Sequence, residues 1–129
     1  MPAAKSLRVL VVDDQESVRG IIRNYVKRLG VENIDTADSG AAALKQLGQQ
    51  PYNLVISDFN MENGSGLDLL KAMRAHPVLK RTPVLMVTGN SDKETVSSVV
   101  SAGVNGYVVK PVSFDGLKQR VEKILGPLT

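Results

Sequence analysis

Short apolar runs alternate along the chain with longer stretches that have helical spacing. The runs are rich in Val and Ile, and they cover residues 9–12, 33–37, 54–57, 84–87 and 107–109. Most of them are continuously apolar instead of alternating with polar residues, and the run over 33–37 is the weakest. This pattern predicts strands that are buried on both faces, as in a parallel sheet.

The stretches between and after these runs predict five helices. In the first, apolar residues recur three or four positions apart, at Val18, Ile21, Ile22, Val26 and Leu29, and Gly30 follows as a stop signal. The others are predicted over 41–47 closed by Gly48, over 67–73, from a capping box at 91–94 to Gly103, and over 117–125. In the fourth helix, Val96, Val99 and Val100 are expected to face inward.

Five consecutive strand–helix units predict an α/β fold with a doubly wound, five-stranded parallel sheet. A chain of 129 residues is too short for an eight-unit barrel. We expect the flavodoxin-like (βα)5 arrangement with strand order 2-1-3-4-5, which places a binding crevice at the carboxyl ends of the first and third strands. Residues 1–129 are expected to form a single domain.

Composition excludes several classes of protein. Hydrophobic residues make up 43% and charged residues 22%, as in globular chains, and the net charge of +3 is too small to indicate nucleic-acid binding. Without cysteine, neither a disulfide framework nor a thiolate zinc site can form. The N-terminus lacks the apolar stretch of a secretory signal, and no apolar run is long enough to span a membrane. We expect a cytoplasmic protein without membrane insertion.

Polar residues end most of the predicted strands. Asp13 and Asp14 follow the first strand, Asp58 the third, Thr88 the fourth and Lys110 the fifth. Because parallel strands share one carboxyl edge, three carboxylates, a hydroxyl and an ammonium are expected to converge there. Each residue alone has an ordinary structural explanation as a turn, cap or surface residue. The joint pattern indicates a site.

This set of groups fits phosphoryl transfer onto an aspartate. Clustered carboxylates suit Mg²⁺, for which Asp13 and Asp14 are the best ligands. Lys110 can neutralise the cluster and bind an anionic oxygen, and the Thr88 hydroxyl can donate a hydrogen bond to it. Asp58 is the best nucleophile because it lies on the central strand.

Asp13-Asp14, Asp58, Thr88 and Lys110-Pro111 resemble the five-position signature of response-regulator receiver domains. The resemblance spans residues 7–125. Within that family the chain is most similar to the stand-alone chemotaxis regulators, which have no effector domain. The segments that carry this likeness are 55–61, 83–88 and 106–111.

The resemblance implies a role for each site residue. Asp58 is expected to accept a phosphoryl group from a phosphohistidine of a histidine kinase or phosphotransfer domain. Mg²⁺ is expected to bind the Asp14 and Asp58 side chains and the Asn60 backbone carbonyl, with Asp13 acting through water. Lys110 and Thr88 are expected to bind the phosphoryl oxygens.

The resemblance also implies a switch and an output surface. Tyr107 is expected to turn inward as Thr88 moves toward the phosphate, and the Lys110–Pro111 bond is expected to be cis. The output face would comprise Lys93, Val96, Val100, Tyr107, Val109 and Arg120.

The implied function is that of a monomeric two-component switch, which is not an enzyme although it assists its own phosphorylation and dephosphorylation. Its expected output partner is the flagellar motor switch in chemotaxis. The alternatives are a phosphate sink, a phosphorelay shuttle, or a regulator of another protein by direct contact.

Three positions depart from the common pattern of receiver domains. Glu62 stands where proline is common, Asn90 where many relatives carry a charged residue, and Val112 where phenylalanine is frequent. These positions bear on the metal site, the phosphate lifetime and the fit of the output partner, respectively.

Arg19, Arg23 and Lys27 recur every four residues on the first predicted helix. They indicate either a solvated face or a docking stripe for an acidic kinase or phosphotransfer domain. Two rival functions share parts of the overall pattern. An aspartyl-nucleophile phosphatase usually carries Asp-x-Asp after its first strand, whereas Asp13 and Asp14 are adjacent here. A flavin carrier needs a cradle for the cofactor phosphate after that strand, and the carboxylates of Asp13 and Asp14 would repel a phosphate.

Overall fold

The computed structural model describes residues 3–61, 64–89 and 92–129. Its main strands are β1 (Arg8–Val12), β2 (Asn33–Ala37), β3 (Leu54–Asp58), β6 (Val84–Thr88) and β7 (Gly106–Val109). Its helices are α1 (Glu16–Arg28), α2 (Gly40–Gln49), α3 (Gly66–Ala75), α4 (Lys93–Ser101) and α5 (Phe114–Leu125). A 3₁₀ turn, Ala4–Ser6, precedes β1, and two short strands, β4 (Asn60–Met61) and β5 (Gly64–Ser65), follow β3.

The five main strands form one parallel sheet in the order β2-β1-β3-β6-β7. Counted without β4 and β5, this is the order 2-1-3-4-5, so the predicted flavodoxin-like fold is confirmed. The labels differ because β4 and β5 pair antiparallel with each other outside the main sheet. The sequence did not predict this pair, because strands of two residues carry no hydrophobic period.

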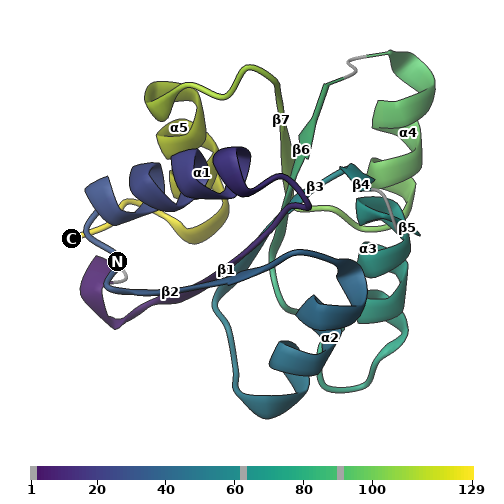
Figure 1. Ribbon diagram of the computed structural model, residues 1–129, viewed down its shortest axis with the longest axis horizontal. Coiled ribbons are helices and arrows are strands. Elements are labelled where there is room, and N and C mark those ends of the chain that lie inside the picture. Colours follow the sequence, from purple (N-terminus) through teal and green to yellow (C-terminus); the bar gives the residue numbers. More distant parts are fainter. Residues whose placement is uncertain (1–2, 62–63, 90–91) are drawn as a thin grey trace.

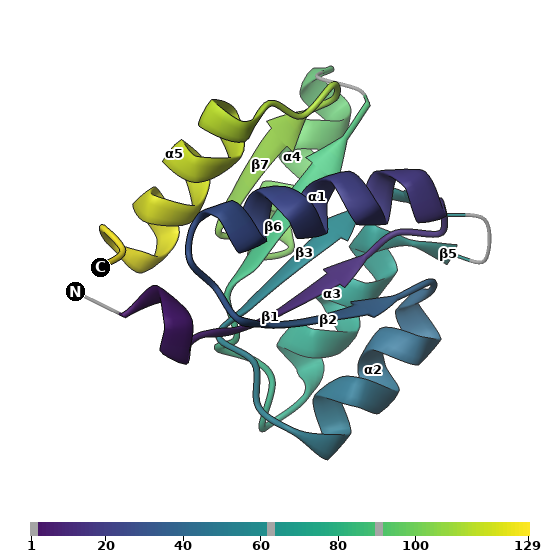
Figure 2. The ribbon, with the colours of Figure 1, turned by 60° about the vertical axis from the view of Figure 1, so that its left-hand side comes forward.

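The sheet lies between two layers of helices. Figures 1 and 2 show α1 and α5 on one face and α2, α3 and α4 on the other. Successive residues of β1 pack alternately into the two layers, with Val9 and Val11 on the side of α1 and α5 and Leu10 and Val12 on the other. Burial on both faces explains why the runs that form β1, β3 and β6 are almost continuously apolar, whereas β2, at one edge of the sheet, is more polar and more exposed.

Two apolar helix positions lie outward, and for Val100 this contradicts the prediction. Ile21 on α1 is 50% exposed and Val100 on α4 is 57% exposed, whereas their neighbours Ile22 and Val99 are almost fully buried. A helix that lies against a flat sheet buries only a narrow stripe of its surface. Residues at the margin of the apolar stripe therefore remain in solvent.

Two helix ends also differ from prediction. Gly48 does not close α2 but lies inside it, and the helix ends at the cap residue Gln50. The N-cap of α4 is Asp92, whose side chain accepts a 2.7 Å hydrogen bond from the backbone N–H of Thr95. The predicted capping residue Ser91 lies outside the described residues.

The first described residues and the last residues of the chain lie together at the amino edge of the sheet (Figure 2). The backbone N–H of Ala4 donates a 3.0 Å hydrogen bond to the carbonyl of Thr129. Because α5 runs back from the carboxyl edge, this contact lies at the opposite edge from the predicted site. Among the described residues, no helix is both long enough and apolar enough to cross a bilayer.

Candidate functional site

The carboxyl edge of the sheet brings the predicted site residues together. Asp13 follows β1, Asp58 and Thr88 are the last residues of β3 and β6, and Lys110 follows β7. Asp13, Asp58 and Thr88 are each at most 2% exposed, although their side chains are polar. Burying polar groups to this extent costs free energy unless hydrogen bonds or opposite charges compensate.

Three carboxylates form the centre of this edge. One oxygen from each of Asp13, Asp14 and Asp58 lies within 4.8 Å of the corresponding oxygens of the other two. Asp13 and Asp58 are buried, and Asp14 is nearer to solvent. At this spacing their negative charges repel one another, and the low dielectric of the sheet edge strengthens that repulsion.

Lys110 provides the nearest positive charge. Its Nζ lies 2.9 Å from Oδ1 of Asp58, with the lysine side chain 30% exposed. The contact is an ion pair without regular hydrogen-bond geometry at Oδ1. The backbone N–H of Lys110 donates a 2.8 Å hydrogen bond to the Thr88 carbonyl. This bond fixes the backbone position from which the Lys110 side chain extends. The Lys110–Pro111 peptide bond is cis, as expected.

Burial raises the pKa of both buried carboxyl groups above the ordinary value of 3.8. For Asp58, the Asp14 charge adds to this effect, while Lys110 and the backbone N–H of Asn60 oppose it. For Asp13, the charges of Asp58 and Asp14 add to the effect, while the Gln15 backbone N–H and Lys110 oppose it. Ionising these groups therefore costs folding free energy in the absence of a further cation.

Two carboxylate oxygens are buried without a hydrogen-bond partner among the described residues. They are Oδ2 of Asp13 and Oδ1 of Asp58. The other oxygen of Asp13, Oδ1, accepts a 2.9 Å hydrogen bond from the backbone N–H of Gln15. An all-oxygen donor set with surplus negative charge and unsatisfied lone pairs fits a hard divalent cation.

The backbone after Asp58 is held by hydrogen bonds on both sides. The N–H of Phe59 donates to the Val87 carbonyl at 2.7 Å, and the N–H of Gly66 donates to the Phe59 carbonyl at 2.8 Å. Asn60, in β4, pairs with Ser65 in β5. This short hairpin returns the chain to α3 directly beside Asp58, where only a glycine fits at position 66.

Of the three positions that depart from the receiver pattern, the structure describes only Val112. Glu62 and Asn90 lie outside the described residues. Val112 is half-buried and packs against the core between the sheet and the layer of α1 and α5. It also lines a cleft of about 310 Å³ together with Tyr107 and Arg120. Val112 therefore contributes both to the core and to the surface near the predicted output face.

Part of the predicted output face surrounds one cleft. Val100, Tyr107 and Arg120 line a cavity of about 210 Å³ at the junction of α4, β7 and α5. The Arg120 guanidinium lies 5.9 Å from the centre of the Tyr107 ring. Val109, on β7, is 39% exposed.

The other two predicted output residues lie earlier on α4. Lys93 is exposed and Val96 is half-buried, and neither lines this cleft.

Arg19 and Gly66 support the site, although neither was predicted to do so. Arg19 donates a 2.7 Å hydrogen bond from Nη1 to the Asp13 carbonyl, whereas Arg23 and Lys27 are exposed. The even spacing of the three basic residues suggested a single surface feature. Contacts to backbone atoms leave no pattern in a sequence, so only the fold distinguishes Arg19 from the other two.

Comparisons with known proteins agree with this geometry. The profile of the "Response regulator receiver domain" family matches residues 9–122. The chain belongs to this family of receiver domains. Membership favours the receiver interpretation over the phosphatase and flavin-carrier alternatives.

Similar proteins align with almost the whole chain. The chain is 41% identical over 120 residues to the chemotaxis protein CheY-3 of Vibrio cholerae, covering 93% of this chain and 92% of the relative. It is 42% identical over 118 residues to the chemotaxis protein CheY of Pseudomonas aeruginosa, covering 92% and 95%. The structure of the V. cholerae chemotaxis response regulator CheY4 superposes with a TM-score of 0.85 at 29% identity, covering 96% and 99% of the two chains.

Replacing Asp13 by Asn is expected to stabilise the metal-free receiver domain at neutral pH. The raised pKa of Asp13 means that, between pH 3.8 and that pKa, the folded state binds more protons than the unfolded chain. The folded state therefore loses stability as the pH rises through this range. An Asn side chain avoids this loss, because it stays uncharged. We expect Asp13→Asn to raise the melting temperature at pH 7 in EDTA by roughly 3–5 °C, which corresponds to about 1 kcal/mol.

The pH dependence tests the electrostatic cause of this stabilisation. The gain should shrink as the pH falls through the raised pKa of Asp13 and should vanish below 3.8, where the carboxyl group is protonated in both states. An equal gain at pH 4 and pH 7 would contradict repulsion and desolvation as the cause.

Replacing Gly66 by Ala is expected to destabilise the fold by about 2–3 kcal/mol. A Cβ at this position would overlap the Asp58 carbonyl oxygen and lie 2.7 Å from the Met86 sulfur. Urea denaturation measures the loss. Gly48→Ala is the matched control, because a Cβ there meets nothing within 4 Å inside α2, and it should gain up to about 1 kcal/mol. Similar stability of the two variants would contradict the close approach at Gly66.

Proposed function

We propose that this receiver domain is a phosphorylation-controlled switch whose phosphoacceptor is Asp58. The observation that carries the proposal is the environment of its carboxylate. Asp58 is buried at the end of the central strand, clustered with two other carboxylates, and its Oδ1 lies 2.9 Å from Lys110 Nζ. Lys110 favours the ionised form of Asp58, and the ionised carboxylate is the nucleophilic form.

The donor would be a phosphohistidine of a histidine kinase or phosphotransfer domain. A carboxylate oxygen of Asp58 forms the new bond to phosphorus as the phosphorus–nitrogen bond breaks, and the imidazole leaves with the electron pair. The Lys110 ammonium and the Thr88 hydroxyl then bind oxygens of the transferred group. Thr88 ends β6, which pairs with the strand of Asp58, and Lys110 follows β7, which pairs with β6, so both groups are positioned before the reaction.

The carboxylates fit Mg²⁺ as the associated cation. We propose that the Asp14 and Asp58 side chains and the Asn60 backbone carbonyl hold it, with Asp13 acting through water. When bound, it supplies positive charge to the phosphoryl oxygens. Two observations support this assignment: Oδ2 of Asp13 is buried without a hydrogen-bond partner among the described residues, and Lys110 is the one cation in direct contact with Asp58 among the ion pairs of the described residues.

Phosphorylation would act through Thr88 and Tyr107. A phosphoryl group adds about −1.5 to −2 of charge, which attracts nearby hydrogen-bond donors. As Thr88 moves toward it, the partly exposed Tyr107 turns inward and the cleft that it lines beside Val100 and Arg120 changes shape. A difference of a few kcal/mol between the two states is enough for this change in population.

We propose that this domain works in the cytoplasm and that its output is a protein of the chemotaxis system, with the flagellar motor switch as the first candidate. Sequence relatives named as chemotaxis proteins support this choice. The domain would work as a monomeric switch and not as an enzyme, although it would assist its own phosphorylation and dephosphorylation. The exposed, partly apolar surface of α4 and β7 supports control of another protein through direct contact.

Phosphorylation should depend on Asp58 and on a divalent cation. After incubation with a small acyl phosphate and Mg²⁺, intact mass should show one added phosphoryl group on wild type and none on Asp58→Asn. Asp38→Asn is the control, since Asp38 is an exposed carboxylate outside the cluster, and it should react like wild type. EDTA should abolish the reaction. Equal modification of Asp58→Asn and wild type would show that Asp58 is not the acceptor.

The output partner should bind only the activated domain. With beryllofluoride and Mg²⁺ as a substitute for phosphate, a pull-down should capture a flagellar switch component. Val100→Asp should abolish capture, because it adds a charge beside the cleft at α4. Val78→Asp is the control, since Val78 is 78% exposed and lies on the connection between α3 and β6.

Capture of a kinase or phosphotransfer protein alone, favoured by the inactive state, would instead identify a phosphate sink or relay.

A further inference from the structure

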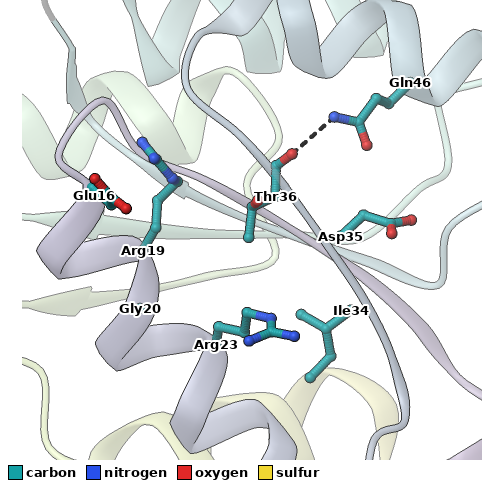
Figure 3. Close-up of a pocket in the computed structure, with 8 residues that line it drawn as sticks. All are labelled: Glu16, Arg19, Gly20, Arg23, Ile34, Asp35, Thr36 and Gln46. Carbon is teal, nitrogen blue, oxygen red and sulfur yellow. Dashed lines mark hydrogen bonds between the residues drawn. The ribbon is translucent and has the colours of Figure 1, made fainter.

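The side chains of Arg19 and Arg23 extend in different directions from α1. Figure 3 shows Arg23 lying toward Ile34 of β2, across a groove of about 520 Å³, while the Arg19 guanidinium lies away from Ile34. Arg19 Nη1 instead reaches the chain after β1, where it donates to the Asp13 carbonyl at 2.7 Å. Arg19 is half-buried, and Arg23 is exposed.

The Arg19 hydrogen bond is one of three that hold Asp13. The backbone N–H of Asp13 donates to the Ala37 carbonyl at 3.1 Å, which joins it to the end of β2. Its side-chain Oδ1 accepts a 2.9 Å hydrogen bond from the backbone N–H of Gln15. The Arg19 bond is charge-assisted, and such bonds are typically stronger than those between neutral groups.

These three contacts leave one polar atom of Asp13 without a hydrogen-bond partner among the described residues. That atom is Oδ2, and it is buried within the carboxylate cluster. Repulsion from Asp14 and Asp58 favours movement of Asp13 away from them. The fixed backbone of Asp13 opposes this movement, because its N–H and its C=O are both held.

We infer that Arg19 is a positioning residue for the divalent-cation site, acting through the Asp13 backbone. It fixes the carbonyl of Asp13 and thereby keeps Oδ2 directed at the cluster. This inference rests on the cation part of the proposed function and is independent of phosphoryl transfer. Groups that orient metal ligands from outside the coordination sphere commonly change metal affinity about tenfold or more.

A purely electrostatic effect of Arg19 would have the opposite sign. Its positive charge repels a cation, so removing that charge alone would tighten cation binding. Loss of positioning weakens binding instead. The direction of the change therefore separates the two effects.

The test is the affinity of the full chain for Mg²⁺, measured by isothermal titration calorimetry. Arg19→Met removes the donor and keeps an extended side chain, and we expect it to raise the dissociation constant about tenfold. Arg19→Lys keeps one donor and should recover most of the affinity. Arg23→Met is the control. It removes the same charge from an exposed position one turn further along α1, and the variant should bind Mg²⁺ like wild type.

Unchanged or tighter binding by Arg19→Met would overturn the positioning role, even if its melting temperature without metal falls. A purely structural role predicts that fall without a change in affinity. Equal weakening in Arg23→Met would also overturn it, because the loss of affinity would then not depend on the hydrogen bond to the Asp13 carbonyl. If wild type binds no Mg²⁺, the cation part of the proposed function fails as well, whereas loss of Asp58 phosphorylation alone leaves this inference standing.

Discussion

Burial of like charges at the carboxyl edge of the sheet is the constraint on which this structure depends. Asp13 and Asp58 lie in an almost dry environment beside Asp14, with one ammonium, that of Lys110, in direct contact. Water would satisfy these groups better than the protein does. The unsatisfied negative charge costs stability when the site holds no cation, and it is also what makes a cation and its anionic ligand favourable there.

The rest of the fold holds this unfavourable cluster in place. The central strands have no exposed apolar side chains, so they form a rigid platform between two layers of helices. Cross-strand hydrogen bonds fix the residues that follow these strands, from Phe59 to Val87 and from Lys110 to Thr88. The site therefore rests on close-packed strand ends, while its conformational response is assigned to the more exposed α4 and Tyr107.

The sheet and most of the site residues could be predicted from the pattern of apolar and polar residues along the chain. Five apolar runs located the sheet, and the polar residues after them located the carboxylates and Lys110. Val100 was wrongly predicted to face inward, because the width of the buried stripe on a helix depends on packing. The contacts of Arg19 and Gly66 were also missed, since both involve backbone atoms that have no residue-specific pattern.

The hydrogen bond between Ala4 and Thr129 has a practical consequence for labelling this domain. The chain ends meet at the amino edge, and the carboxylates lie at the carboxyl edge, a full strand length away. A fluorophore or immobilisation tag attached near Ala4 or Thr129 is therefore separated from the cation site. Because the ends are adjacent, a short linker could also join them, so that new termini could be opened in another loop without breaking the sheet.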